Sequence, residues 1–392
     1  MIELLNKKCL KMMQNYIIVF SRHIDNWGAE RSTCSLCKGL KDKGYNVLVV
    51  IPRSGAIIEL LKQNQIEYII HDFSTWLYLG DNRPSFKHLC KVQVQKWFGL
   101  YSLKHRLKKN GIKPILVYSN TITFDFGIRF AQLNHIPHVQ HIRENIDAFD
   151  YHFILGYKRS MSLINSSYAI MCTCDTIRNR YLPNLEGNKF FTVHNGVPPI
   201  DIVPEKNFDQ KTLEIIQVAR FMDDKRVIDS LVAMKKLKDY GINNVHLDLY
   251  GKGEEEKKYI EYIEENDLAK FVTIKGFVQK IDFRSYHVGL MTSTFEAFSR
   301  SVLDYMNNGL AVIASKAGGN IEQVVDGMSG ILYEVKNPED LANAILKLYC
   351  NRSELKMFAM NARKRYLDNF TQDRYVSKTN EIIIKAINNE QL

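Results

Sequence analysis

Short runs of apolar residues alternate with longer amphipathic stretches along the whole chain. This alternation is typical of parallel βα units, in which each buried strand is followed by a helix that packs on the sheet. The first series of strands is expected at Tyr16–Ser21, Val47–Pro52, Tyr68–His71, Ile115–Ser119, His138–Ile142, Ala169–Cys172 and Phe191–Val193. A second series is expected at Leu213–Ala219, Val245–Tyr250, Val272–Lys275, Val288–Thr292, Ala311–Ala314 and Ile331–Tyr333.

The two series are separated by Asn195-Gly-Val-Pro-Pro199 and a polar stretch that ends at Gln210. Glycine and consecutive prolines interrupt regular structure, so the domain boundary is expected between 195 and 210. We predict an α/β protein with two Rossmann-like, doubly wound parallel-sheet domains, at 1–198 and 199–370. A C-terminal helix at 371–392 could pack back towards the first domain. Ligands of open parallel sheets bind outside the carboxyl ends of the strands, so function is expected in those loops, around an interdomain cleft.

Composition agrees with a globular enzyme, because 45% of the 392 residues are hydrophobic and 24% are charged. The seven cysteines follow no disulfide framework, and reduced thiols are expected. Cys34 and Cys37 fall within an amphipathic stretch, which favours buried core thiols over a zinc or redox site. No run is apolar enough to span a membrane, and residues 1–11 lack the features of a signal peptide. A cytoplasmic location is therefore expected.

The net charge of +10 is concentrated in the first part of the chain. Residues 1–115 hold 19 basic and 8 acidic residues, a balance of +11, so the remainder sums to −1. Pro84–Lys113 contains eight Lys or Arg, no Asp or Glu, and several aromatic residues. Such a stretch predicts an amphipathic helix that could lie on an anionic membrane surface. The alternative is a packing helix with a solvated basic face. Nucleic acid is not an expected partner, because no nucleic-acid-binding module accompanies the charge.

The segment from Thr294 to Ser315 carries the strongest chemical signal. Glu296 follows the expected strand Val288–Thr292, and a helix is expected at Ser301–Asn308. Backbone amides at the start of a helix are unpaired and lie at its positive end, which suits a diphosphate. We expect this role for the free amides of Phe298, Ser299, Arg300 and Ser301. Asp304, one helical turn further, could reach a ribose hydroxyl. Each residue taken alone would fit a surface Glu, a helix-capping Ser or a solvated Asp.

Two cations follow the first strand of the second series. Arg220 lies at the end of that strand, and Lys225 lies five residues later at the start of a helix. Together they could hold both phosphates of a nucleotide diphosphate. Surface solvation is the alternative for both residues.

In the first domain, two positions have the right place for a site. Gly28 lies between a strand and a helix, where a missing side chain lets a phosphate or an acceptor approach the backbone. No G-x-G-x-x-G motif is present, which disfavours a nicotinamide cofactor. His141 ends an expected strand and could hydrogen-bond a sugar or orient an acceptor. His135 and His138 lie nearby, so the assignment could be shifted along the strand, and a structural histidine is the alternative.

These motifs, in this order and spacing, resemble family 4 glycosyltransferases, which are retaining enzymes of the GT-B fold. The resemblance rests on Glu296-x-Phe298 with Asp304, on Gly309–Ala314 and Gly318–Gly330, and on Trp27–Arg31, Tyr118–Thr121, His141–Glu144, His194–Val197, Arg220 with Lys225, and Tyr250–Gly253. It implies a nucleotide-diphosphate-sugar as co-substrate, a leaving-group clamp at Arg220 and Lys225, a functional His141, and no required metal or other cofactor. Three departures stand out, because the usual residues would be Glu at 304, Gly at 299 and Gly at 27.

The predicted activity is transfer of a hexose-type sugar to a glycan or lipid-linked acceptor in cell-surface polysaccharide synthesis. Glu296 is expected to orient the donor sugar through its hydroxyls rather than to act as a nucleophile. Two alternatives remain: a nucleotide-sugar epimerase on the same fold, and a non-catalytic nucleotide-sugar-binding protein.

Overall fold

The computed structural model describes the chain apart from residues 1–12, 23, 26, 27 and 204. The chain forms two compact units. The first unit extends to Thr173 and also contains Ile177–Val193 and Tyr375–Leu392, whereas the second contains Cys174–Thr176 and His194–Arg374. The main changes between units therefore fall at 193/194 and 374/375. The boundaries expected from the sequence were 198/199 and 370/371. Trp27 and the N-terminal residues 1–11 lie outside the described part.

The first unit is built on a sheet of seven parallel strands. Its order is β3 (Glu67–Ile70), β2 (Asn46–Ile51), β1 (Gln14–Phe20), β5 (Ile112–Ser119), β6 (His138–Ile142), β8 (Ala169–Cys172) and β9 (Phe190–Thr192). The strand order changes direction between β1 and β5, as in a doubly wound sheet. All seven strands expected from the sequence are present. A separate antiparallel pair, β4 (Leu77–Leu79) with β7 (Tyr151–Phe153), was not expected.

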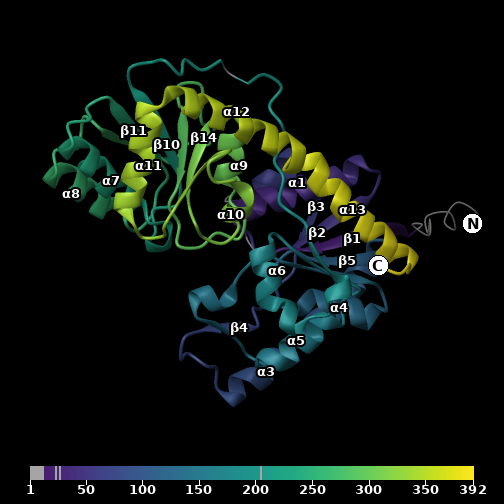
Figure 1. The fold of residues 1–392 in the computed structure, drawn as a ribbon. Helices are drawn as coiled ribbons and strands as arrows, with labels where there is room; N and C mark the ends of the chain where they lie inside the picture. Colours follow the sequence, from purple (N-terminus) through teal and green to yellow (C-terminus); the bar gives the residue numbers. More distant parts are fainter. Residues whose placement is uncertain (1–12, 23, 26–27, 204) are drawn as a thin grey trace, which may run out of the picture. The chain divides into compact units, whose positions relative to one another are not determined.

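Helices cover both faces of this sheet (Figure 1). Alternate residues of β1 pack against the helices of opposite faces. Ile17 and Val19 pack in a core with side chains of α1 (Gly28–Asp42), α2 (Ile57–Gln63) and the C-terminal helix α13 (Gln372–Asn388). Ile18 and Phe20 pack in a second core with side chains of α3 (Phe86–Lys109) and α4 (Phe126–Asn134). Two further helices are α5 (Tyr157–Asn165) and α6 (Asp175–Tyr181). Cys34 and Cys37 are free thiols buried in α1, which confirms the core interpretation.

The second unit has six parallel strands. Their order is β12 (Val272–Gly276), β11 (Val245–Tyr250), β10 (Leu213–Val218), β13 (Val288–Met291), β14 (Ala311–Ser315) and β15 (Gly330–Tyr333). The six expected strands are therefore all confirmed, and the order reverses between β10 and β13. The helices are α7 (Val227–Asp239), α8 (Glu256–Glu265), α9 (Arg300–Asn307), α10 (Asn320–Gln323), α11 (Pro338–Cys350) and α12 (Arg352–Asn369).

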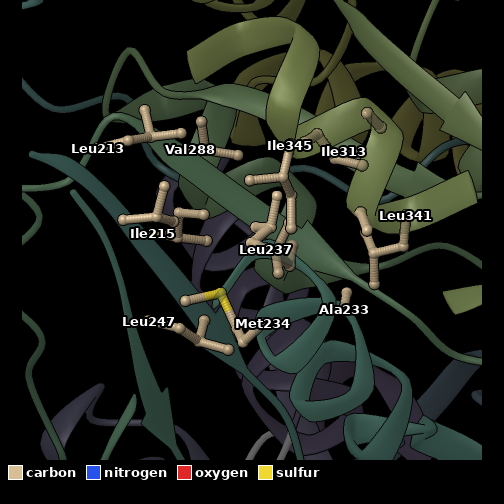
Figure 2. Close-up of a cluster of buried hydrophobic side chains, with 14 of the residues drawn as sticks. Leu213, Ile215, Ala233, Met234, Leu237, Leu247, Val288, Ile313, Leu341 and Ile345 are labelled. Atoms are coloured by element: carbon tan, nitrogen blue, oxygen red, sulfur yellow. The ribbon is translucent and has the colours of Figure 1, made fainter. Parts of the chain in front are cut away.

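A single large core lies on one face of the second sheet. Figure 2 shows Leu213 and Ile215 of β10 beside Met234 and Leu237 of α7, with Leu341 of α11 on the same side. On the opposite face, Gly289 of β13 leaves room for α9, because a Cβ there would lie 2.2 Å from the Tyr305 ring. In the described part of the chain, no helix combines the length and apolarity that a membrane span requires.

Candidate functional site

The candidate site of the second unit lies where its strand order reverses. β10 and β13 are neighbours in the sheet, and the loops that follow them carry Arg220–Lys225 and Ser293–Ser299. A doubly wound sheet opens at this point, because the connections on either side of it run to opposite faces. The two segments that the sequence singled out in this unit therefore meet at one edge of one sheet.

Lys225 and Glu296 form an ion pair between these two loops. The Nζ atom of Lys225 lies 2.7 Å from Oε1 of Glu296 and 3.2 Å from Oδ2 of Asp224. The hydroxyl of Ser293 also donates to Oε1 of Glu296, at 2.9 Å. Burial opposes the charge on Lys225, but Glu296 and Asp224 outweigh it and raise the pKa of the ammonium group. Lys225 therefore stays charged at neutral pH, and it already holds two carboxylates.

Buried hydrogen bonds fix the loops that carry this pair. The hydroxyl of Thr292 donates to the backbone carbonyl of Lys225 at 2.7 Å, and the side-chain amide of Gln217 donates to the same hydroxyl at 2.7 Å. The amide of Thr294 donates to the carbonyl of Asp224 at 2.9 Å. These contacts join the end of β13 to the loop after β10. The ion pair consequently rests on a positioned backbone rather than on two mobile side chains.

Two consecutive glycines pack against the backbone of the Glu296 turn. The amide of Gly319 donates to the carbonyl of Glu296 at 2.7 Å. A Cβ at Gly318 would lie 1.9 Å from that carbonyl oxygen, and one at Gly319 would lie 2.2 Å from the carbonyl oxygen of Ala297. Gly318 also has a φ of +51°, which disfavours other residues. The sequence analysis recorded this pair only as part of a resemblance and missed its role in shaping the turn.

The start of α9 differs from expectation at Ser299. Its amide donates to Oε1 of Gln323 at 2.9 Å, and the side chain of Gln323 donates back to the Ser299 carbonyl at 2.7 Å. The Ser299 hydroxyl accepts from the amide of Val302, as a helix cap does. The expectation of a free amide was wrong for Ser299, because a glutamine far along the chain occupies it. The capping alternative is what the structure shows.

The other expected donor-binding residues of α9 keep their places at this edge. Phe298 is buried just before the helix, and the Ser301 hydroxyl donates to the carbonyl of Val218 at 2.9 Å. That bond ties α9 to the end of β10. Arg300 and Asp304 lie half-buried on the helix, one turn apart.

Arg220 lies on the exposed loop that follows β10. The backbone on either side of it runs against a glycine-containing loop after β11. A Cβ at Gly251 would lie 1.8 Å from the carbonyl oxygen of Ala219, and one at Gly253 would lie 2.2 Å from that of Phe221. These two glycines therefore allow the close approach that places Arg220 at the carboxyl edge of the sheet.

A ring stack that the sequence analysis did not assign supports the Phe298 turn. The ring of His194 lies parallel to that of Phe298, with centroids 4.8 Å apart, and Phe370 packs edge-on against Phe298 at 5.4 Å. Nε2 of His194 lies 3.1 Å from Oε2 of Glu322. His194 and Glu322 stand in motifs that the sequence analysis quoted, but only the fold brings them to one another.

In the first unit, His141 is enclosed rather than accessible. It lies at the end of β6 and is fully buried, with Nδ1 beside the Tyr118 hydroxyl and no partner for Nε2 among the described residues. Burial, reinforced by the charge of Arg143, holds the pKa of His141 well below its usual range, so the ring is neutral. A catalytic role for His141 stays a prediction.

Arg143, two residues further along, is a buried cation at this edge of the first sheet. It is buried, and its Nε donates to Oδ1 of Asn120 at 2.8 Å, while NH2 donates to the Tyr375 hydroxyl at 2.7 Å. Asn120 directly follows β5, the strand next to β1. Gly28 begins α1 as expected, and its role stays a prediction. Sequence reasoning missed Arg143, although it stands in the same quoted motif as His141.

Substitution of Gly318 tests the packing of the Glu296 turn. We expect Gly318→Ala to lower the thermal unfolding midpoint clearly more than Gly327→Ala. Both glycines have positive φ, so in both variants the left-handed backbone conformation costs about 1–2 kcal/mol of folding free energy. Only the alanine at 318 meets a carbonyl, because nothing lies within 4 Å of the Cβ position at 327. Equal midpoints for the two variants, measured by calorimetry, would contradict this account of the turn.

A second prediction concerns the pH dependence that Glu322 gives the second unit. Burial alone would raise the pKa of this carboxyl, but hydrogen bonds from His194 and from the amides of Asp175 and Thr176 bring it below 4.5. Its stabilising effect is therefore present above pH 4.5 and is lost as the pH falls through the folded-state pKa.

We expect Glu322→Gln to reduce the free energy of unfolding by about 1–3 kcal/mol at pH 7. The deficit should shrink steadily in acid below pH 4.5, where the wild-type carboxyl also becomes neutral. Urea titrations at several pH values would measure this, with the exposed Glu334→Gln as control. A deficit that stays constant into acid would contradict the assignment.

Known proteins resemble this chain in sequence and in fold. Residues 200–365 match the family model of glycosyl transferases group 1. The poly(glycerol-phosphate) alpha-glucosyltransferase of Bacillus subtilis is 28% identical over 48% of this chain and 28% of its own length. The poly(ribitol-phosphate) alpha-N-acetylglucosaminyltransferase of Staphylococcus aureus is 26% identical over 65% of this chain and 51% of its own length. The matched parts span between 28% and 54% of the first three curated relatives.

One relative matches over most of both chains. It is the N,N'-diacetylbacillosaminyl-diphospho-undecaprenol alpha-1,3-N-acetylgalactosaminyltransferase of Campylobacter jejuni, which is 23% identical over 89% of this chain and 94% of its own length.

Solved structures share the fold. The Anabaena protein HepE, crystallised with UDP and glucose, has a TM-score of 0.74 and 19% identity, covering 94% of this chain and 99% of its own. A glycosyltransferase from Rickettsia africae has a TM-score of 0.75 and 17% identity, covering 95% and 98%. The two parallel-sheet units thus have the GT-B architecture that the sequence predicted. Residues 200–365, which lie within the second unit, are thus similar to group 1 glycosyl transferases, and the two units share the fold of the GT-B glycosyltransferases.

Proposed function

We propose that this protein is a retaining glycosyltransferase, which moves a hexose-type sugar from a nucleotide-diphosphate-sugar to a glycan or lipid-linked acceptor. The observation that carries the proposal is the Lys225–Glu296 pair at the point where the strand order of the second sheet reverses. It holds a carboxylate in a fixed orientation beside the loop of Arg220. A fixed carboxylate next to a cation suits a sugar attached to a diphosphate, because the two groups need opposite partners.

The relatives favour a particular donor and acceptor chemistry. HepE was crystallised with UDP and glucose, and the three transferases named above transfer a glucose or an N-acetylhexosamine in alpha linkage. Their acceptors are polyol phosphates or a diphospho-undecaprenol. We therefore propose a uridine diphosphate sugar as donor and a phosphate-bearing acceptor in cell-surface polysaccharide synthesis. The excess of +11 within residues 1–115 supports an anionic acceptor at the cytoplasmic face of a membrane.

In the proposed reaction, negative charge grows on the departing diphosphate while positive charge grows on the sugar. Arg220 would meet the diphosphate first, since it lies on the exposed loop after β10. The positive end of α9 supports the same charge, although the amide of Ser299 is not available. Lys225 has three N–H donors, and among the described residues its contacts with Glu296 and Asp224 account for two, so the third would serve a phosphate oxygen. These groups would stabilise the leaving group without a required metal.

Glu296 then has a role that differs from that of a nucleophile. Its Oε1 is occupied by Lys225 and Ser293, so the remaining oxygen is the one that would accept from a donor-sugar hydroxyl. Fixing the sugar in this way lowers the entropic part of the activation barrier, because the reacting groups are already oriented. For a retaining transfer, the acceptor would attack on the departure face, with a diphosphate oxygen taking its proton. The alpha linkages of the relatives are those that retention from an α-linked donor would produce.

The test of the reaction is Glu296→Gln. We expect this variant to lose transfer by at least about a hundredfold while it stays folded, since one lost positioning contact can cost that much. Mass spectrometry of an added acceptor with UDP-sugars would measure transfer, and it separates a transferase from an epimerase, which changes only the donor. Glu334→Gln, which disrupts an exposed ion pair with Lys316, is the control. Wild-type turnover by Glu296→Gln would remove Glu296 from the site.

Removal of Arg220 or Lys225 is expected to affect both UDP binding and turnover, to different extents. Arg220→Ala and Lys225→Ala should each weaken UDP binding by about 1–3 kcal/mol, the scale of charge-assisted hydrogen bonds. Both variants should also lower turnover at saturating donor, because both lose stabilisation of the departing diphosphate, and Lys225→Ala should lower it further because it also releases Glu296. Calorimetric titration and initial rates would show this, with Arg284→Ala as the control for an exposed arginine in the same unit. Unchanged UDP affinity in both variants would reject the clamp.

A further inference from the structure

Helix α3 belongs to the first unit (Figure 1). It has two apolar faces, of which only one is packed against a core among the residues that the structure describes. Its inner face contributes Leu100, Leu103 and Leu107 to a buried core. Its outer face leaves large side chains in solvent, with exposed fractions of 54% for Val94, 47% for Trp97, 74% for Phe98 and 57% for Tyr101. We call these four residues the outer face. Leaving so many large apolar side chains in water on one helix needs a reason, because exposed apolar patches mark contact surfaces.

The outer face is continuous and is bordered by lysines. Its four residues follow the i, i+3, i+4, i+7 spacing, so they form one stripe along the helix. Residues seven apart lie on nearly the same side of a helix. Lys91 lies seven residues before Phe98, and Lys108 lies seven residues after Tyr101. Lys87 stands in the same relation to Val94. Aromatic rings thus occupy the middle of the stripe, and ammonium groups stand at both ends.

Buried polar contacts hold α3 in place. Nζ of Lys96, on the inner side, lies 2.7 Å from Oδ1 of the buried Asp125, and Nε of Arg129 lies 2.6 Å from the other oxygen of that carboxylate. The carbonyl of Gly99 lies 2.9 Å from Nε2 of His71. An ion pair of this kind is costly to break, because removal of one member leaves a buried charge. The outer face is therefore a preformed surface rather than a mobile segment.

The charge of the segment that carries the outer face has one sign. No Asp or Glu occurs in the sequence between Asp81 and Asp125. Among the residues that the structure describes, no carboxylate forms an ion pair with Lys87, Lys91 or Lys108. Tryptophan and tyrosine are favoured at the level of lipid headgroups, and lysine stems extend along apolar surface while their ammonium groups reach phosphates. This combination suits an anionic bilayer surface, into which an amphipathic helix inserts one side.

We propose that the outer face of α3 docks on an anionic lipid bilayer. The inference deepens the proposed function and rests on it for the lipid-linked acceptor, but lipid binding is measured without any sugar transfer. A second copy of this chain is a less suitable occupant. A two-fold contact through α3 would bring lysines of the two copies together, because lysines stand at both ends of the stripe, and like charges across an interface are unfavourable.

An exposed cysteine next to the outer face allows a fluorescent label to be placed there. Trp97 belongs to the outer face, and Cys90 lies seven residues before it and is exposed. A fluorophore sensitive to polarity can be attached to Cys90 in the Cys9→Ser, Cys350→Ser double variant. Its emission should shift to the blue with vesicles of phosphatidylglycerol and phosphatidylcholine, but not with phosphatidylcholine alone. The same label on Cys350, with Cys9 and Cys90 changed to Ser, should not respond.

Matched variants separate this surface from general charge. Sedimentation of the full chain with the anionic vesicles should show Lys87→Gln, Lys91→Gln and Lys108→Gln together weakening binding by roughly a hundredfold, about fivefold per lysine. The triple change Lys356→Gln, Lys364→Gln and Lys378→Gln alters the net charge equally, at exposed positions of α12 and α13, and should have little effect. Phe98→Ser should weaken binding several-fold, whereas Met360→Ser, at another exposed apolar position, should not.

Three results would overturn the proposal. The first is absence of vesicle binding at low salt, and the second is equal loss of binding in the two lysine variants. The third is a concentration-dependent dimer, seen by analytical ultracentrifugation, that Phe98→Ser abolishes, because a second copy would then occupy the outer face. If vesicles bind through α3 and no sugar transfer is found with any acceptor, the proposed function fails while the bilayer contact stands.

Discussion

A single ammonium group joins the two loops on which the candidate site depends. Nζ of Lys225 lies between the carboxylates of Asp224 and Glu296, and hydrogen bonds from Thr292 and Thr294 hold the backbone on either side. A largely buried ammonium group requires such partners, because an unpaired charge is costly away from water. The same pairing constrains Glu296, whose turn can approach the next loop only because Gly318 and Gly319 lack side chains. Charge pairing and close backbone packing thus support one geometry.

The fold was largely predictable because its signal is local. A buried parallel strand is an apolar run, and all thirteen expected strands are found at or within a few residues of their expected bounds. The pair β4 and β7 was missed, because strands of three residues are too short to show a period. The sequence predicted an amphipathic helix in the region of α3, but it could not show which apolar side chains of this helix the core would bury.

The candidate site was predictable where one segment of the chain carries it. Glu296, Arg220 and Lys225 follow strands, and neighbouring parallel strands end at the same edge. Contacts between distant segments could not be derived in this way. The bond from Ser299 to Gln323 removed an amide that looked available, and the stack of His194 on Phe298 joins positions about a hundred residues apart. His141 followed its strand as expected, yet the rings and helices around it closed it off from solvent.

The position of α13 in the first unit has a consequence for how the protein is made. Tyr375, Val376 and Ile383 belong to the same core as Ile17 and Val19 of β1, the opposite end of the chain. A Cβ at Gly39 of α1 would lie 2.4 Å from Val376, so the two helices are in direct contact. Domains usually fold in the order of synthesis. Here, α1 and α2 can pack on this face of the sheet early, but the apolar side chains that α13 covers stay exposed on the ribosome until the whole second unit and residues 375–388 have been translated.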